Sequence, residues 1–240
     1  MEPRTRELLA TFSRPVPRYT SYPTAPHFDA KVDAAAVSGW IGALRPGDTL
    51  SLYIHIPYCD RLCWFCACHT KHTLKYEPIA AYLESLKQEI VTVGARVDDG
   101  VKVTGVHWGG GSPTMLKPDD MKALMDCLRA HFNFADNAEI SVEMDPNDLD
   151  EARYDALAAI GLTRASLGVQ DFDETVQKTI NRLQSFEQTA AVIAAMRARG
   201  VRSVNCDLLY GLPHQSLETL ARTVNDILSL RPDRLALFGY

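Results

Sequence analysis

The sequence predicts an α/β fold, a partial (β/α)6 TIM-like barrel of parallel strands that follows an N-terminal arm. From residue 50 onward, strand-like apolar runs alternate with helical patterns, as in successive βαβ units. Strand interiors are mostly apolar, whereas cysteines, glycines and carboxylates come where the strands end. Parallel α/β folds place their active sites at these carboxyl ends. We therefore expect an arm over residues 1–49 and a catalytic barrel over residues 50–240.

The arm is rich in proline. Residues 14–18 and 22–26 each contain two prolines, which predicts extended chain rather than helix. A short helix is expected over residues 34–44, and a Pro-Gly-Asp turn at residues 46–48 leads into the first strand. The residues alone leave open whether 18–24 form a plain surface arm or a segment that covers a site.

The barrel region contains six strand-like runs, at residues 50–56, 103–108, 139–144, 164–169, 203–209 and 234–238. Apolar residues recur with helical spacing at 79–90 and 121–128. Ser185 and Gln188 predict a capping box for a helix that ends at Gly200. Ser216 begins the last helix, which ends before Pro232. This order of elements predicts a parallel sheet.

The composition is that of an ordinary globular protein, with 46% hydrophobic residues, 23% charged residues and a net charge of −5. This balance provides no basic surface for nucleic acid or for an anionic membrane. The N-terminus has no signal-peptide core, and no apolar run is long enough to span a bilayer. We expect a cytoplasmic monomer that binds neither nucleic acid nor membrane.

Four of the six cysteines lie within ten residues, in the sequence CDRLCWFCAC at 59–68, directly after the first predicted strand. Thiolates this close repel one another, and a shared cation removes that repulsion, so the loop predicts a metal site. Cys59, Cys63 and Cys66 have the spacing C-x3-C-x2-C. Three thiolates bind three irons of a cubane cluster and leave the fourth iron open for a small chelating molecule.

Two alternatives to the cluster stay open from the spacing. Zinc requires four ligands, and the fourth could come from Cys68, His55 or His69. Disulfides or inert cysteines are the third alternative, which the absence of a secretory signal disfavours.

Other candidate residues follow the later strands. The turn GGGSPT at 109–114 offers backbone that a ligand can approach, although it is not the dinucleotide-binding pattern. Glu143 and Asp145 project from the same side of a strand and could act as acid–base groups or metal ligands. For Asp145 we favour a simple turn with Pro146. His107 is interpreted as a core histidine, and the role of His55 stays open.

The cysteine spacing resembles the cluster loop of radical S-adenosylmethionine (SAM) enzymes. Three longer motifs resemble the family of oxygen-independent coproporphyrinogen III oxidases: SLYIHIPYC at 51–59, the C-x-C tail at 66–68 and RYTSYPT at 18–24. The resemblance runs from about residue 18 to the last residue. It implies the same partial barrel. It also favours the interpretation of residues 18–24 as a segment that lies over the active site.

The resemblance also implies the cofactors and their contacts. A [4Fe–4S] cluster would be bound by Cys59, Cys63 and Cys66, together with two molecules of SAM. Contacts to the first SAM are expected from Tyr53, Gly110 and Glu143. Contacts to the second are expected from Phe65, Gly111, Ser112, Gln170, Arg182 and Asp207. Cys68, which stands outside the three-ligand set, is expected to be catalytic.

The activity that the resemblance implies is oxidative decarboxylation of two propionates of coproporphyrinogen III to vinyl groups in haem biosynthesis. The expected partners are this substrate and an electron donor and acceptor that the sequence does not identify. A related haem-carrying protein is one alternative, but such relatives typically have phenylalanine in place of Cys68. A zinc-stabilised binding module without turnover is the other. The family continues past the sixth strand, so its carboxyl-terminal domain is expected to be absent from this chain.

Overall fold

The computed structural model describes residues 2–12, 24–28 and 32–240, which separate into two compact units, Met1–Ile41 and Gly42–Tyr240. The first unit contains helix α1 (Pro3–Phe12), a 3-10 turn η1 (Ala25–His27) and most of helix α2 (Ala34–Gly42). Helix α2 confirms the helix expected over residues 34–44. Helix α1 was not predicted; its first residue is proline, which is tolerated in the first helical turn because no hydrogen bond is lost there.

The predictions for the proline-rich segments have two outcomes. Residues 14–18 and 18–23 lie outside the described residues. In the described part of the second segment, the chain forms the 3-10 turn η1 instead of the extended conformation that was predicted. Proline fixes the backbone angle φ at a value that occurs both in a 3-10 turn and in extended chain. The proline content alone therefore did not distinguish these two conformations.

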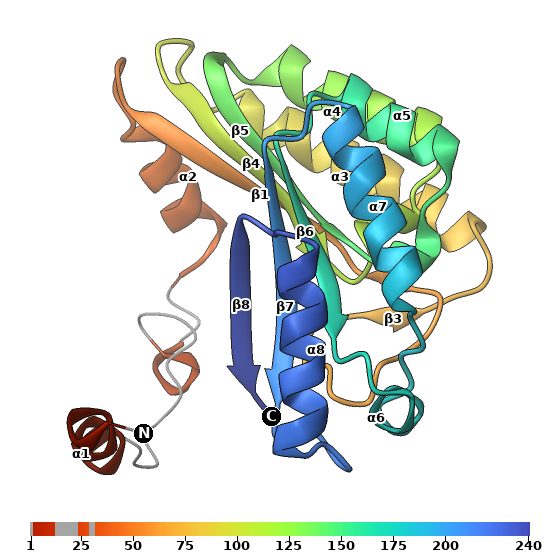
Figure 1. The fold of residues 1–240 in the computed structure, drawn as a ribbon. Helices are drawn as coiled ribbons and strands as arrows, with labels where there is room; N and C mark the ends of the chain where they lie inside the picture. Colours follow the sequence, from red (N-terminus) through yellow and green to blue (C-terminus); the bar gives the residue numbers. More distant parts are fainter. Residues whose placement is uncertain (1, 13–23, 29–31) are drawn as a thin grey trace. The chain divides into compact units, whose positions relative to one another are not determined.

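The second unit is built on an open, six-stranded sheet with the order β1-β4-β5-β6-β7-β8, in which every pair is parallel. All six predicted strands are confirmed. Neighbours in the sheet follow the order of the chain, as expected for a partial barrel (Figure 1). The strands are β1 (Thr49–Ile56), β4 (Lys102–Gly110), β5 (Phe134–Met144), β6 (Arg164–Gln170), β7 (Ser203–Tyr210) and β8 (Arg234–Gly239).

Helices that connect the strands cover one face of this sheet (Figure 1). Helix α5 was not predicted, because its alanine-rich sequence has little apolar periodicity; Asp150 caps it by accepting a bond of 2.8 Å from the Arg153 amide. The helices are α3 (Glu77–Gly94), α4 (Pro118–His131), α5 (Glu151–Ala159), α6 (Glu174–Thr179), α7 (Phe186–Ala198) and α8 (Leu217–Ser229).

Two helix starts test the capping predictions. Ser185 accepts a bond from the Gln188 amide and begins α7, but the Gln188 side chain donates to the Pro146 carbonyl, so the reciprocal half of the predicted capping box is missing. A complete capping box is formed instead by Ser216 and Thr219 at the start of α8. Both helices begin where the sequence predicted.

Alternation along the strands divides the sheet into two chemically different faces. Ile56, Trp108 and Val142 are fully buried under the helices. Their sequence neighbours project to the opposite side, because successive residues of a strand point to opposite faces. We call that side the open face; it carries Tyr53, His107, Ser141, Ser166 and Asn205.

The two cysteines outside the loop pack against the core. Cys206 is fully buried between the sheet and the helices. Cys127 is only partly buried, and packs against the same core from α4.

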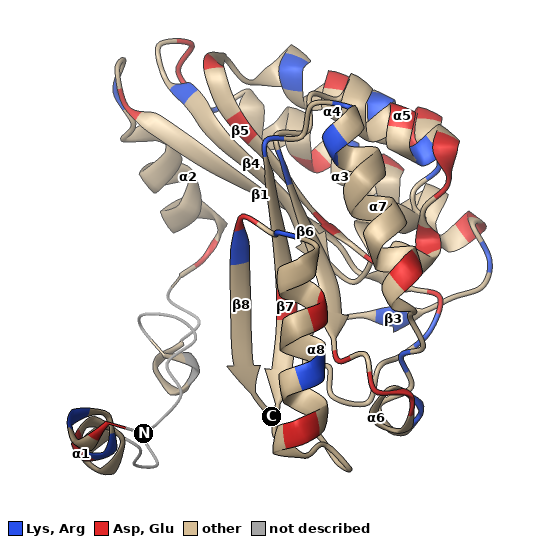
Figure 2. Cartoon of the chain, in the orientation of Figure 1, with Lys and Arg blue, Asp and Glu red and all other residues tan. Residues whose placement is uncertain are grey.

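Charges on the helices are interspersed rather than segregated by sign, as Figure 2 shows along α5. Arg199, directly after α7, pairs with Glu151 and Asp155 of α5 at 2.7 and 2.8 Å. Such pairs are partly exposed and contribute little to stability. Within the described ranges, no helix is long and apolar enough to cross a membrane.

Candidate active site

A cavity of about 460 Å³ opens at the carboxyl ends of the strands, between the cysteine loop and the rim of the sheet. Of the residues predicted to form the site, all but Tyr53 line it. The lining includes Cys59, Cys63, Phe65, Cys66, Cys68, Gly110, Gly111, Ser112, Glu143, Gln170, Arg182 and Asp207. The structure therefore brings together the ends of β4, β5, β6 and β7, the turn after β4, the cysteine loop and the segment between α6 and α7.

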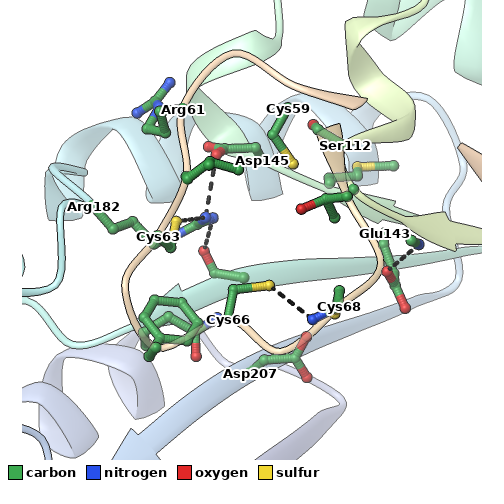
Figure 3. A pocket seen from close by; sticks show the side chains of 18 of the residues that line it. Cys59, Arg61, Cys63, Cys66, Cys68, Ser112, Glu143, Asp145, Arg182 and Asp207 are labelled. Atoms are coloured by element: carbon green, nitrogen blue, oxygen red, sulfur yellow. Dashed lines mark hydrogen bonds and ion pairs between the residues drawn. The ribbon is translucent and has the colours of Figure 1, made fainter. Parts of the chain in front are cut away.

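The cysteine loop is anchored at both ends. It begins and ends in a two-residue parallel pair that was not predicted, β2 (Tyr58–Cys59) and β3 (Lys71–His72). On its far side, the amide of Trp64 donates to the carbonyl of Ile180 at 3.0 Å, and the Asn181 side chain donates to the carbonyl of Leu62 at 2.9 Å. Figure 3 shows Cys59, Cys63 and Cys66 projecting from this loop around one space.

The chemistry of the thiols fits a polynuclear cluster. Burial, together with the nearby Cys66 and Cys63 thiols, raises the pKa of Cys59 to about 12. Burial also raises the pKa of Cys63. These thiols therefore ionise only when a cation compensates, as iron does. Among the described residues, no three His, Cys, Asp or Glu side chains converge as ligands of a single ion. This arrangement is compatible with a cluster, in which each thiolate binds a different iron.

Cys68 interacts with Cys66 rather than with the other two cysteines of the triplet. Its backbone amide donates to Cys66 Sγ at 3.4 Å. Hydrogen bonding from Cys68 lowers the pKa of the Cys66 thiol to about 6. Cys68 thus lies beside the triplet and lines the same cavity.

Arg182 is buried in the cavity wall behind Cys63. One guanidinium nitrogen lies 3.6 Å from Cys63 Sγ and 3.2 Å from a carboxylate oxygen of Asp145. The other donates to the Gly168 carbonyl at 2.6 Å. The turn predicted at Asp145 is confirmed, because its other oxygen accepts from the Asn147 amide at 2.9 Å. Its ion pair with Arg182 was not predicted.

Two positions of the glycine turn require glycine, one because of its backbone angle and the other because another part of the backbone lies too close for a Cβ atom. Gly110 has φ of +113°, and a Cβ atom on Gly111 would lie 2.5 Å from the Tyr58 carbonyl oxygen. Ser112 bonds through its hydroxyl to Asp148 and, at 3.0 Å, to Thr114. The turn therefore presents bare backbone to the cavity, while the Ser112 hydroxyl is engaged by a carboxylate.

Glu143 projects into the cavity from the end of β5. Its Oε1 lies 3.1 Å from His107 Nε2, and its Oε2 accepts from the Gly110 amide at 3.2 Å. The interpretation of His107 as a core histidine is wrong, since its side chain is 38% exposed on the open face. Tyr53 stacks on the His107 ring and forms a hydrogen bond of 3.1 Å with His55; neither histidine lines the cavity, so Tyr53 is linked to it through His107 and Glu143.

Gln170 and Asp207 stand at the ends of neighbouring strands. Gln170 is 9% exposed and has φ of +70°, next to a register shift between β6 and β7. Such strain in a residue other than glycine is often found at functional sites. Asp207 accepts bonds from Asn205 at 2.8 Å and Ser166 at 3.3 Å, and burial raises its pKa. The Asp207 side chain is therefore held in place by two protein hydrogen bonds.

Asp148 and Asn205 were not predicted from the sequence; neither lines the cavity, but they hold the cavity residues Ser112 and Asp207 by hydrogen bonds. Burial, together with the nearby Asp145 carboxylate, raises the pKa of Asp148 to about 6. Asn205 was detectable, because it precedes Asp207 by two positions on the same strand and must share its face. Asp148 follows a turn, where no periodicity reveals burial.

The sequence matches the model of the radical SAM superfamily over residues 53–227. The chain belongs to the radical SAM superfamily. The cofactors of this superfamily are a [4Fe–4S] cluster and SAM, which agrees with the cysteine loop and the cavity. Solved radical SAM proteins of low identity share the fold, for example the methyltransferase TsrM from Kitasatospora setae, with a TM-score of 0.53 at 18% identity over 80% of this chain and 36% of that chain.

More similar radical SAM relatives carry the name oxygen-independent coproporphyrinogen III oxidase. The protein from Paracoccus denitrificans is 49% identical over 98% of this chain and 52% of its own length. The solved coproporphyrinogen III oxidase from Escherichia coli, described as a radical SAM enzyme, has a TM-score of 0.89 at 40% identity, covering 98% of this chain and 52% of that chain. The chain thus spans about half the length of the relatives it matches.

Proposed function

We propose that this protein acts in the oxidative decarboxylation of coproporphyrinogen III, converting two propionate side chains to vinyl groups and giving protoporphyrinogen IX. The observation that carries the proposal is the meeting of the cysteine triplet and the strand-end residues in one cavity. The names of the relatives at 40–49% identity support the choice of substrate.

In this proposal Cys59, Cys63 and Cys66 hold the cluster. When bound, the cluster and SAM supply a 5′-deoxyadenosyl radical, which removes one hydrogen atom from the β-carbon of a propionate. The substrate then loses carbon dioxide and gives one electron to an acceptor, which leaves the vinyl group. The electron donor and the acceptor are both unidentified. We further propose that the protein works as a cytoplasmic monomer, without nucleic acid or membrane.

The chain's own residues bind and orient the cofactors. We assign Tyr53, Gly110 and Glu143 to the first SAM. Glu143 keeps a free lone pair on each carboxylate oxygen, which suits the ribose hydroxyls. The residues assigned to the second SAM are Phe65, Gly111, Ser112, Gln170, Arg182 and Asp207. Cys68 is proposed as the catalytic residue because it lines the cavity outside the ligand triplet.

The test is an anaerobic assay of protein with a reconstituted cluster. Deoxyadenosine and vinyl products are quantified together, with SAM, coproporphyrinogen III and a chemical reductant present. We expect both products, formed in a fixed ratio. Absence of deoxyadenosine would refute radical SAM activity. Deoxyadenosine without vinyl product would refute the proposed substrate only.

A further inference from the structure

His107 is a polar residue of the open face to which the proposed function gives no role. It lies on β4, in register with Tyr53 of β1 and Ser141 of β5. Both neighbours contact its imidazole: Ser141 Oγ lies 3.1 Å from Nδ1, and the Tyr53 ring stacks on it with centroids 5.8 Å apart and 17° between the planes. The ring orientation is therefore fixed from two sides.

The fixed ring directs one nitrogen at Glu143. Nε2 lies 3.1 Å from Glu143 Oε1. An ionised carboxylate only accepts hydrogen bonds, so Nε2 carries the hydrogen, and in the neutral imidazole Nδ1 accepts from the Ser141 hydroxyl. The Glu143 carboxylate thus selects this tautomer, and the Ser141 hydroxyl is compatible with it because it can donate to Nδ1.

The Glu143 carboxylate has one protein donor on each oxygen, His107 on Oε1 and the Gly110 amide on Oε2. The carboxylate occupies space that only glycine leaves free, since a Cβ atom on Gly109 would lie 2.9 Å from the carboxyl carbon. The side chain is still 43% exposed and lines the cavity. Each oxygen keeps a lone pair that can accept a ligand hydroxyl.

We propose that His107 is a positioning residue, which holds the Glu143 carboxylate in the orientation that binds two adjacent hydroxyls of a nucleoside ligand. The inference rests on the proposed function, because SAM is the nucleoside assigned to Glu143. His107 itself does not line the main cavity; it lines a separate pocket of about 280 Å³ on the open face. Its effect on the ligand therefore passes through residues that it contacts, either Glu143 by the hydrogen bond or Tyr53 by the stacked ring, and removal of Glu143 separates the two routes.

The test measures SAM affinity by anaerobic calorimetry on reconstituted protein of equal iron content. His107→Ala should weaken binding about tenfold, the size expected for losing one hydrogen bond to a charged group. His107→Gln should recover most of the affinity, because its amide can donate to the same oxygen. Ser51→Ala is the matched control, since Ser51 lines the same pocket on the open face and should leave SAM affinity unchanged.

A double-mutant cycle separates positioning from a general structural effect. In the Glu143→Ala background, His107→Ala should have no further effect on SAM affinity. An undiminished effect in that background, or unchanged affinity in the His107→Ala single variant, would overturn the inference while the proposed function stands. Should the alanine variant fail to fold, His107→Gln and His107→Leu give the same comparison. Wild-type protein that binds a cluster but no SAM would overturn both.

Discussion

At the scale of single residues, buried charges determine how the cavity wall is built. Arg182 and Asp145 have side chains about 10% exposed and form a pair at 3.2 Å. A charge buried without a partner is costly, so the two residues depend on each other. The pair also orients the guanidinium towards Cys63 Sγ. Hydrogen bonds to cluster sulfurs are one means by which a protein sets the reduction potential.

Asp145→Asn should lower the free energy of unfolding by about 3 kcal/mol or more, because it leaves the Arg182 charge buried and uncompensated. Asparagine keeps the side-chain oxygen that accepts from the Asn147 amide, so the turn is retained. Urea unfolding measures the difference. The matched control is Glu151→Gln, which removes a surface ion pair and should change stability by less than ~1 kcal/mol. Equal effects of the two variants would contradict the prediction.

Asp148 predicts a pH dependence. Burial raises its pKa from 3.8 to about 6, with the Asp145 and Asp60 carboxylates adding to the effect and Ser112 and Arg61 opposing it. Between pH 4 and 6 the unfolded chain has lost this proton while the folded protein keeps it. The stability contribution of Asp148 therefore falls as the pH rises through this range and is constant above about pH 6.

Asp148→Asn removes the carboxyl group whose ionisation destabilises the folded protein. At pH 7 the variant should be more stable than the wild type by on the order of 2 kcal/mol, and the gain should disappear as the pH falls to about 4. Urea unfolding at several pH values provides the measurement. Asp119→Asn, at a side chain that is 98% exposed, serves as the control without such a trend. A gain that does not change with pH would show that Asp148 is not buried with a raised pKa.

At the scale of elements, the end of β4 and the start of the cysteine loop are interlocked. The Gly111 amide donates to the Ile56 carbonyl at 2.8 Å, and the Ser112 amide donates to the Tyr58 carbonyl at 2.7 Å. Tyr58 directly precedes Cys59. The glycine turn therefore sets the position of the first cluster ligand, besides presenting backbone to the cavity.

Gly111→Ala should reduce the iron content after reconstitution, although Gly111 is not a ligand. Its new Cβ would lie 2.5 Å from the Tyr58 carbonyl oxygen and would displace the backbone before Cys59. Iron analysis and the optical spectrum measure the loss. Gly105→Ala on the same strand is the control, because its nearest contact would be an ordinary 3.4 Å from Ser51. Full iron content in Gly111→Ala would mean that the loop position does not depend on the turn.

At the scale of the whole molecule, the sheet divides the barrel unit into an apolar half under the helices and a polar open face. The core holds the helices and strands together, while the cysteine loop is attached to it through a few backbone hydrogen bonds, such as that from Trp64 to Ile180. A cluster bound by three cysteines of this loop adds binding free energy to the folded state.

Removing iron from the reconstituted protein with a chelator should lower its melting temperature, by about 2–4 °C for each kcal/mol of lost binding energy. Cys68→Ala should keep both the iron and the stabilisation, whereas Cys63→Ala should lose both. Cys127→Ala, on α4, serves as the control for removal of a thiol elsewhere. A Cys68→Ala protein without iron would make Cys68 a fourth ligand and exclude an open iron.

The sequence by itself determined the six strands, their parallel order and the strand ends at which the candidate residues stand. These features follow from local periodicity and from where apolar runs stop, and neither depends on distant residues. The C-x3-C-x2-C spacing likewise placed the candidate ligands on one loop. Helix α5 was missed because its periodicity is weak.

Only the tertiary structure decided which partner each side chain meets. Arg182 and Cys63 are 119 residues apart in the chain, and His107 and Glu143 are 36 apart. Strand periodicity indicates the face on which a residue lies, but register and sheet curvature decide its neighbours across that face. For this reason the sequence interpreted His107 as a core residue and Asp145 as a turn alone. In the folded protein, His107 donates a hydrogen bond to Glu143, and Asp145 is the counter-ion of Arg182.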